Sequence, residues 1–257
     1  MARHGGRRYL SGHAVLAPNG LTFFTSETNA DTGQGLVVER DLQSLRKLRE
    51  FPSGGIGPHA LLLEPAGTLL VANGGILNLP ETGRRKLNIA HMDPNLTRLD
   101  TDSGHALAQY RLPDHYLSLR HLALAPNDIV GVALQAEHPE AQARQTAPAL
   151  ALLEGDHLRA IPWDAAGAPA GWDGYGGDVC CAANRFWVSA PHAGWLTSWS
   201  QEGQDGSVQA LPGAGALATQ GARWLVGGSQ TAWVYQASTH PQHYGIALPW
   251  DNHAVLV

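Results

Sequence analysis

A repeated pattern constrains the fold of this chain more than any other feature. Each copy begins with a polar or small residue, in most cases histidine. Four or five apolar residues follow, then a turn rich in Pro, Gly, Asn or Asp, and then a second apolar run. Four short antiparallel strands with their turns need about 40 to 45 residues, the size of one propeller blade. The copies begin, at intervals of 46, 62, 57, 38 and 37 residues, at His13, His59, His121, Asp178, Ala216 and His253.

The repeat predicts an all-β fold: a β-propeller of four-stranded antiparallel blades, with about five blade units. The last copy, residues 252–257, is an orphan inner strand at the C-terminal end, and residues 1–12 can supply only about one strand. We therefore expect a single β-propeller domain over residues 1–257, which either closes with five blades or lacks the N-terminal part of its ring. A β-sandwich is the alternative, but sandwiches do not repeat a histidine-led strand at blade spacing.

Composition excludes several classes of protein. Charged residues make up only 15% of the chain, and 30 Gly and 16 Pro are unlike a coiled coil or a disordered tail. A net charge of −5 leaves no general basic surface, so we expect no nucleic-acid partner. No apolar run approaches the roughly 20 residues of a membrane helix, and residues 1–12 contain no signal peptide. The two cysteines, Cys180 and Cys181, are adjacent, and we expect free thiols in a buried strand.

The repeated histidines are the candidate metal ligands. Innermost strands of a propeller run along its central channel, so residues at equivalent positions converge around one axis. His13, His59, His121 and His253 each stand immediately before a predicted innermost strand. Neutral imidazole is the commonest protein ligand for transition metals, which predicts a site for iron, copper or zinc at the channel mouth. The alternative is a structural role, in which each ring bonds to a turn carboxylate or to the backbone.

Four further residues are candidates for binding a ligand or for orienting the imidazoles. Glu27, Asn73 and Gln135 follow the predicted second strands, whose ends lie near one rim in every blade. Arg120 precedes His121 and could bind an anion such as a carboxylate or a phosphate. Ordinary turn chemistry is the alternative for the strand ends, since Asn and Gly tolerate left-handed backbone.

Several short segments together resemble the bacterial domain of unknown function 1513 family over nearly the whole chain. The resemblance implies a seven-bladed propeller that is exported to the periplasm, with periplasmic iron-uptake proteins as partners, and it implies no reaction. The family's signal and its first blade and a half have no counterpart in residues 1–257. The segments that carry the resemblance are residues 12–13, 51–59, 71–76, 83–88, 120–123 and 250–253.

Three functions are consistent with these features. The sequence favours a periplasmic binding or accessory protein of iron acquisition with a His-lined metal site. A protein-interaction scaffold with structural histidines comes second. A metal-dependent, lactonase-like hydrolase or an oxidase comes third, because only analogy of fold supports it. The chain has no nucleophile elbow, phosphate loop, dinucleotide fingerprint or HExxH helix, so the sequence leans against an enzyme.

Overall fold

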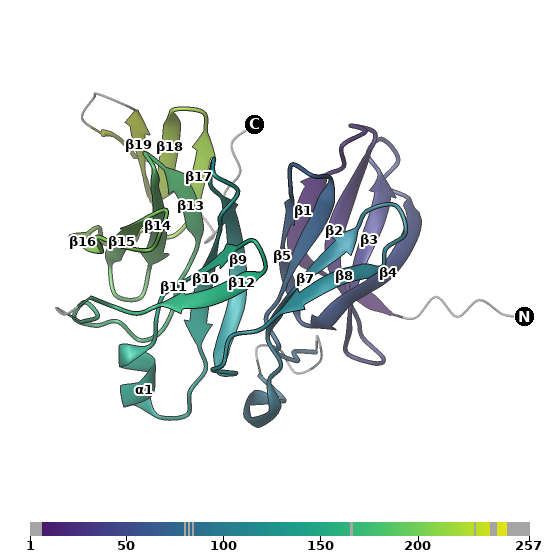
Figure 1. The fold of residues 1–257 in the computed structure, drawn as a ribbon, viewed down its shortest axis with the longest axis horizontal. Coiled ribbons are helices and arrows are strands. Elements are labelled where there is room, and N and C mark those ends of the chain that lie inside the picture. The colour runs from purple at the N-terminus through teal and green to yellow at the C-terminus, as the bar shows by residue number, and fades with distance from the viewer. Residues whose placement is uncertain are drawn as a thin grey trace, which may run out of the picture. The chain divides into compact units, whose positions relative to one another are not determined.

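The computed structural model describes residues 7–79, 81, 83, 85–164, 167–228, 230–236 and 241–245. These residues form five four-stranded antiparallel sheets, each built from four strands that are consecutive in the chain (Figure 1). By compactness the chain divides into two units between Arg120 and His121, inside one strand. The prediction of a single domain over 1–257 stays a prediction.

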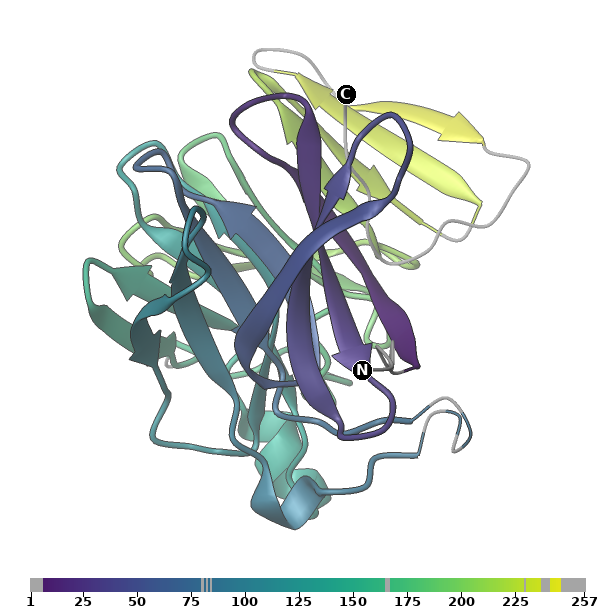
Figure 2. The same cartoon turned by 90° about the vertical axis from the view of Figure 1, so that its right-hand side faces the viewer.

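The first unit contains two complete sheets, the first of which twists strongly across its four strands (Figure 2). Their strands are β1 (Arg8–Leu16), β2 (Thr22–Asn29), β3 (Gln34–Asp41), β4 (Lys47–Ile56), β5 (Pro58–Leu63), β6 (Thr68–Asn73), β7 (Asn95–Asp100) and β8 (Ala106–Tyr110). A single turn of 3-10 helix, η2 (Ile89–His91), lies in the insertion before β7.

The second unit begins within β9 and contains three sheets. One short helix, α1 (Ala141–Thr146), lies between the second and third strands of the first of these sheets. The strands are β9 (Leu117–Leu124), β10 (Val130–Ala136), β11 (Leu150–Glu154), β12 (His157–Ile161), β13 (Val179–Ala182), β14 (Arg185–Ala190), β15 (Trp195–Ser200), β16 (Ser207–Ala210), β17 (Leu217–Gln220), β18 (Arg223–Gly227), β19 (Thr231–Gln236) and β20 (Gln242–Gly245).

Apolar faces of neighbouring sheets make the cores. In the first unit, Phe24, Val37 and Phe51 of the first sheet pack with Leu69 and Val71 of the second. The second unit has its own clusters, one of which includes the fully buried Phe186. Central strands are therefore covered on both faces, which explains their near-continuous apolar sequences.

The all-β, propeller-like fold predicted from the repeat is confirmed, and every predicted second strand is present. The predicted place of the histidines is wrong in detail, because His13, His59 and His121 lie inside β1, β5 and β9 rather than before them. The reason is that pairing extends upstream of the apolar run, as where Arg8 to Leu10 pair with Asn29 to Glu27. The orphan strand at 252–257, with His253, lies outside the described residues.

Among the described residues, no helix has the length and apolar composition needed to cross a membrane.

Candidate metal centre

His13 lies in a bulge of the first innermost strand. Leu10 pairs with Glu27 and Ala14 pairs with Thr25, so three residues of β1 face a single residue of β2. Gly12 supplies the positive φ of 96° that the bulge needs, and a side chain there would be strained although the space is open. A bulge redirects the side chains next to it, and this one carries His13.

His59 occupies a second bulge, at the start of the next innermost strand. Pro58 pairs with Asn73 and Leu61 pairs with Val71, so His59 and Ala60 together face one residue of β6. Both bulges therefore contain a repeat histidine. The sequence repeat indicated which residues are equivalent, but it gave no sign of the bulges.

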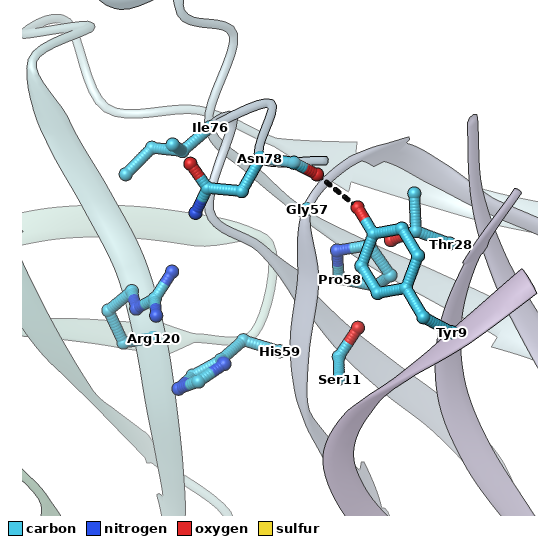
Figure 3. Close-up of a pocket in the computed structure, with 9 residues that line it drawn as sticks. All are labelled: Tyr9, Ser11, Thr28, Gly57, Pro58, His59, Ile76, Asn78 and Arg120. Carbon is cyan, nitrogen blue, oxygen red and sulfur yellow. Dashed lines mark hydrogen bonds between the residues drawn. The ribbon is translucent and has the colours of Figure 1, made fainter. Parts of the chain in front are cut away.

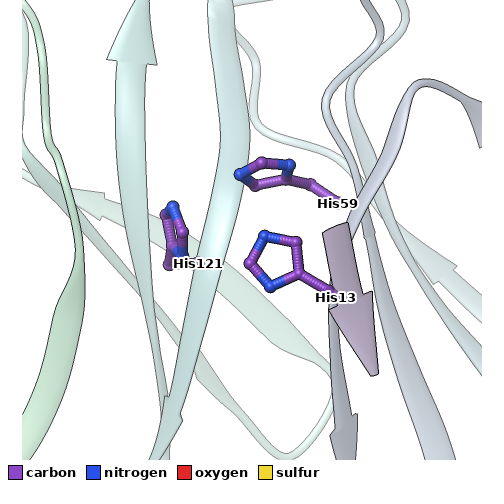
Figure 4. A group of neighbouring side chains, drawn as sticks. All are labelled: His13, His59 and His121. Carbon is purple, nitrogen blue, oxygen red and sulfur yellow. The ribbon is translucent and has the colours of Figure 1, made fainter. Parts of the chain in front are cut away.

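The two imidazoles are in contact within the first unit. The ring centroids of His13 and His59 are 4.3 Å apart and the ring planes are inclined by 64°, an edge-to-face arrangement (Figure 4). Both side chains are half-buried. Two adjacent imidazoles at this separation can coordinate one transition-metal ion from the same side.

His121, in the second unit, lies beside a buried carboxylate. Its Nδ1 atom is 3.3 Å from Oδ1 of Asp178, and the two residues are 2% and 0% exposed. A carboxylate at Nδ1 orients an imidazole and directs its Nε2 lone pair outward, as in many metal sites. His13 and His59 in the first unit, and His121 in the second, are each candidate metal ligands.

Asp178 also holds the second unit together. Its Oδ1 accepts a hydrogen bond from the backbone N–H of Val179, and its Oδ2 accepts one from Leu217 at the start of β17. The Asp178 N–H donates to the Ser189 hydroxyl. This carboxylate therefore links the beginnings of β13 and β17, and the sequence marked it only as an equivalent position in the repeat.

The structure places Glu27 in an ion pair. The Glu27 side chain is 1% exposed, and its Oε1 is 2.6 Å from Nη2 of Arg40 and accepts a hydrogen bond from the Thr25 hydroxyl. These contacts give the carboxylate a structural role within the first sheet. Glu27 stays a candidate for the layer around the metal only by its place in the sequence.

Asn73 is fully buried at the junction of the two sheets of the first unit. Its amide nitrogen donates to the Ser53 carbonyl, to Asn95 and to Thr97, and its oxygen accepts from the Ser53 hydroxyl. With both ends of the amide used, Asn73 joins β4 to β6 and β7. The sequence alternatives were a ligand and a turn residue, and these contacts indicate neither.

Gln135 and Arg120 take different positions. Gln135 lies in the second unit, where it donates to the Gly176 carbonyl and pairs with Tyr175 in an isolated bridge. Arg120 lines a cavity of the first unit together with His59 (Figure 3). Arg120 is therefore the predicted ligand-binding residue that the structure brings to a repeat histidine.

Sequence reasoning missed the polar residues around this cavity. Tyr9 and Ser11 line it from β1, and Asn78 lines it from the insertion that follows β6. The Tyr9 hydroxyl donates to the Asn78 carbonyl. Tyr9 and Ser11 precede His13 at two-residue spacing, which in a strand places residues on one face and could have identified them.

The thiols are free, as predicted. Cys180 is buried and Cys181 half-buried on β13. Burial raises the pKa of Cys181 to about 11, and burial followed by the nearby Asp178 charge raises the pKa of Cys180 well above its ordinary value. Both are neutral thiols at pH 7, a poor form for a metal ligand.

Comparison with solved structures supports the fold. The chain is 10% identical to a chain titled U3-55K (TM-score 0.58, covering 92% of this chain and 64% of that one). It is 10% identical to a functionally unknown protein from Desulfotomaculum acetoxidans (TM-score 0.62, 96% and 73%). It is 13% identical to Kuenenia stuttgartiensis hydrazine synthase (TM-score 0.56, 91% and 71%). The chain spans less than two thirds of the first structure, and at these identities the likeness concerns the fold alone.

Sequence comparison gives the family. No curated protein sequence matches the chain significantly. A family model described as "Protein of unknown function (DUF1513)" matches residues 1–257. The resemblance carried by the GIGPH, VANGGI and RKLN segments is thus confirmed, and the chain belongs to the DUF1513 family.

Proposed function

We propose that this protein binds a transition-metal ion through the histidine pair His13 and His59 and serves iron acquisition in the periplasm as an accessory protein. The observation that carries the proposal is the contact between the His13 and His59 rings, with centroids 4.3 Å apart. Two imidazoles brought together by two separate bulges make a preformed half of a coordination sphere, since bulges re-aim side chains at functional sites.

His121 is a separate candidate ligand in the second unit, by its position in the repeat and its contact with Asp178. It is the third copy of the same inner-strand position. Its Nδ1 atom faces the Asp178 carboxylate, which leaves Nε2 as the coordinating atom. The two protein ligands of the first unit leave the other coordination positions of a tetrahedral ion open, and an exogenous ligand can fill one of them. The neutral imidazole set suits iron, copper and zinc.

The periplasmic location and the iron-uptake partners rest on the family resemblance. Membership of the family supports them only indirectly, because its description assigns no function. Pull-down of candidate iron-uptake proteins from periplasmic extract, with and without added metal, tests this part of the proposal.

Metal analysis of protein purified without chelator tests the site. We expect the double variant His13→Ala, His59→Ala to lose at least about tenfold in metal affinity. The exposed His105 and His157 provide a matched control, and the double variant His105→Ala, His157→Ala should retain the metal. Equal metal content in the wild type and the His13/His59 variant would refute the site.

A scaffold with structural histidines is the second candidate, and the buried contact between His121 and Asp178 favours it. This function predicts that neither the wild type nor any histidine variant takes up metal, while His121→Gln lowers the melting temperature. The metal analysis therefore separates the two functions.

A further inference from the structure

A cavity of about 170 Å³ adjoins the histidine pair within the first unit. Tyr9 and Ser11 of β1, Thr28 of β2, and Pro58 and His59 of β5 line it (Figure 3). Arg120 and residues 57, 76 and 78 complete the lining. Because His59 belongs both to the ring pair and to the cavity wall, an occupant of the cavity would lie against a candidate metal ligand.

Two glycine-containing segments build one wall and hold each other by backbone hydrogen bonds. The Gly74 N–H donates to the Gly57 carbonyl and the Gly75 N–H to the Ile56 carbonyl, both at 2.9 Å. Gly57 and Gly75 have φ values of 61° and 73°, and an added Cβ would lie 2.5 Å from the Ile76 carbonyl oxygen or 2.7 Å from the Pro94 nitrogen. These close approaches make the wall rigid and explain why glycine stands at both positions.

Asn88 fixes the segment that continues this wall. Its Oδ1 accepts from the Leu77 N–H at 2.7 Å, and its Nδ2 donates to the Gly75 carbonyl at 2.8 Å. These two hydrogen bonds hold residues 75–77 of the wall in place. The GIGPH, VANGGI and RKLN segments all contribute to this one feature.

Arg120 reaches the cavity across Gly74. A Cβ at Gly74 would lie 3.0 Å from Nη1 of Arg120 and 2.8 Å from the Ser118 hydroxyl, which itself donates to the Gly74 carbonyl. Gly74 thus leaves room for the guanidinium group. Its backbone, held by Ser118, sets the position of this part of β9.

The polar lining is suited to an anion. It offers the Arg120 guanidinium, the His59 imidazole and the hydroxyls of Ser11 and Thr28, and none of the residues that line the cavity is acidic. Glu27, which precedes Thr28 in the chain, forms an ion pair with Arg40. Guanidinium recognises carboxylate through paired, charge-assisted hydrogen bonds, with hydroxyls as additional donors.

We infer that this cavity binds a small carboxylate, with Arg120 as its main partner. Since one water occupies about 30 Å³ of liquid, the volume holds roughly six waters, or a di- or hydroxycarboxylate of about that size. The inference extends the proposed function, because a carboxylate placed against His59 could fill an open coordination position of the metal. Binding of the anion by Arg120 and the hydroxyls does not itself require the metal.

Titration calorimetry of the metal-free protein tests the inference, with malonate as the probe and malonamide as its uncharged counterpart. We expect malonate to bind and malonamide not to, and Arg120→Gln to weaken malonate at least about tenfold. Arg111→Gln is the matched control, since Arg111 pairs with Asp93 and does not line the cavity. Ser11→Ala should weaken malonate by a smaller factor, and it provides a second variant if Arg120→Gln does not fold.

Two results would overturn the inference: no malonate binding by the folded wild type, or equal malonate affinity in the wild type and in both cavity variants. Because the titration uses metal-free protein, these results leave the histidine site to the metal analysis. Conversely, the protein could bind malonate in an Arg120-dependent way and yet take up no metal. That result would support the carboxylate site and refute only the proposed function.

Discussion

His59 in the first unit and Asp178 in the second occupy equivalent places in the repeat, yet their surroundings differ. His59 is half-buried, contacts His13 and faces a cavity. Asp178 is fully buried, and its two carboxylate oxygens accept backbone N–H groups of Val179 and Leu217. The same position of the repeat therefore lines an accessible polar cavity in the first unit and stabilises the interior of the second unit.

The contrast teaches that a residue's place in the repeat does not determine its role. What separates the two positions is the burial of their side chains. Asp178 compensates its buried charge with backbone donors, as a buried carboxylate must. His59 borders open space, so its imidazole can reach an incoming ligand.

The sharpest test of this contrast compares Asp178→Ala with His59→Ala. Removing the Asp178 carboxylate leaves the buried N–H groups of Val179 and Leu217 without an acceptor, and we expect a loss of about 3–5 kcal/mol in the free energy of unfolding. His59→Ala should cost less than about 1 kcal/mol, because the side chain is half-exposed. Urea unfolding measures both. Similar costs for the two variants would remove the distinction.

Asn73→Ala asks whether the first unit also has a purely structural centre. The substitution leaves the buried Ser53 carbonyl and the Asn95 and Thr97 side chains without their amide partner, so we expect about 2–4 kcal/mol of destabilisation. Metal content and malonate affinity of the folded fraction should stay at wild-type values. If the variant lost metal content or malonate affinity while its stability stayed unchanged, Asn73 would be a ligand-binding residue after all.

The pH dependence of the two thiols gives the smallest effect and reports on the second unit. Burial raises the pKa of Cys181 from 9.0 to about 11, and burial followed by the Asp178 charge raises the pKa of Cys180 well above 9.0. Between pH 9 and 11 the unfolded chain loses thiol protons that the folded chain keeps, so stability falls as pH rises through this window. Below pH 9 the thiols contribute no slope.

Urea midpoints at pH 8, 9 and 10 check this expectation, with the variant Cys180→Ala, Cys181→Ala as the comparison. The wild type should lose stability above pH 9 more steeply than the variant. Tyr235, whose pKa burial also raises, adds to the fall in both proteins above pH 10. Parallel curves for the two proteins would show that the thiols ionise as easily in the folded state as in the unfolded chain.

Much of the fold was predictable because strand sequence is a local signal. The buried run Leu69 to Ala72, for example, is the second apolar run of its copy of the repeat and forms most of β6. The equivalence of His13 and His59 in the repeat likewise anticipated their contact. The bulges around both residues were not predictable, because a bulge is a property of two paired strands and appears in neither sequence alone.

The cavity was less predictable than the histidines. Arg120 was a candidate from its place beside His121, but the wall opposite it depends on how residues 74–78 return toward Gly57. Asn73 and Glu27 were chosen for their polar groups at strand ends. Tertiary contacts with Ser53 and Arg40 determine what those groups bind, and no spacing rule encodes such distant partners.

The Asn88 contacts have a consequence for protein engineering. Together with the hydrogen bond from the Leu87 N–H to the Leu77 carbonyl, they close the base of the segment between Leu77 and Asn88. Both ends of this segment are therefore held by hydrogen bonds, and lengthening a segment with fixed ends costs little entropy. We expect an affinity tag inserted there to leave the fold of the first unit in place.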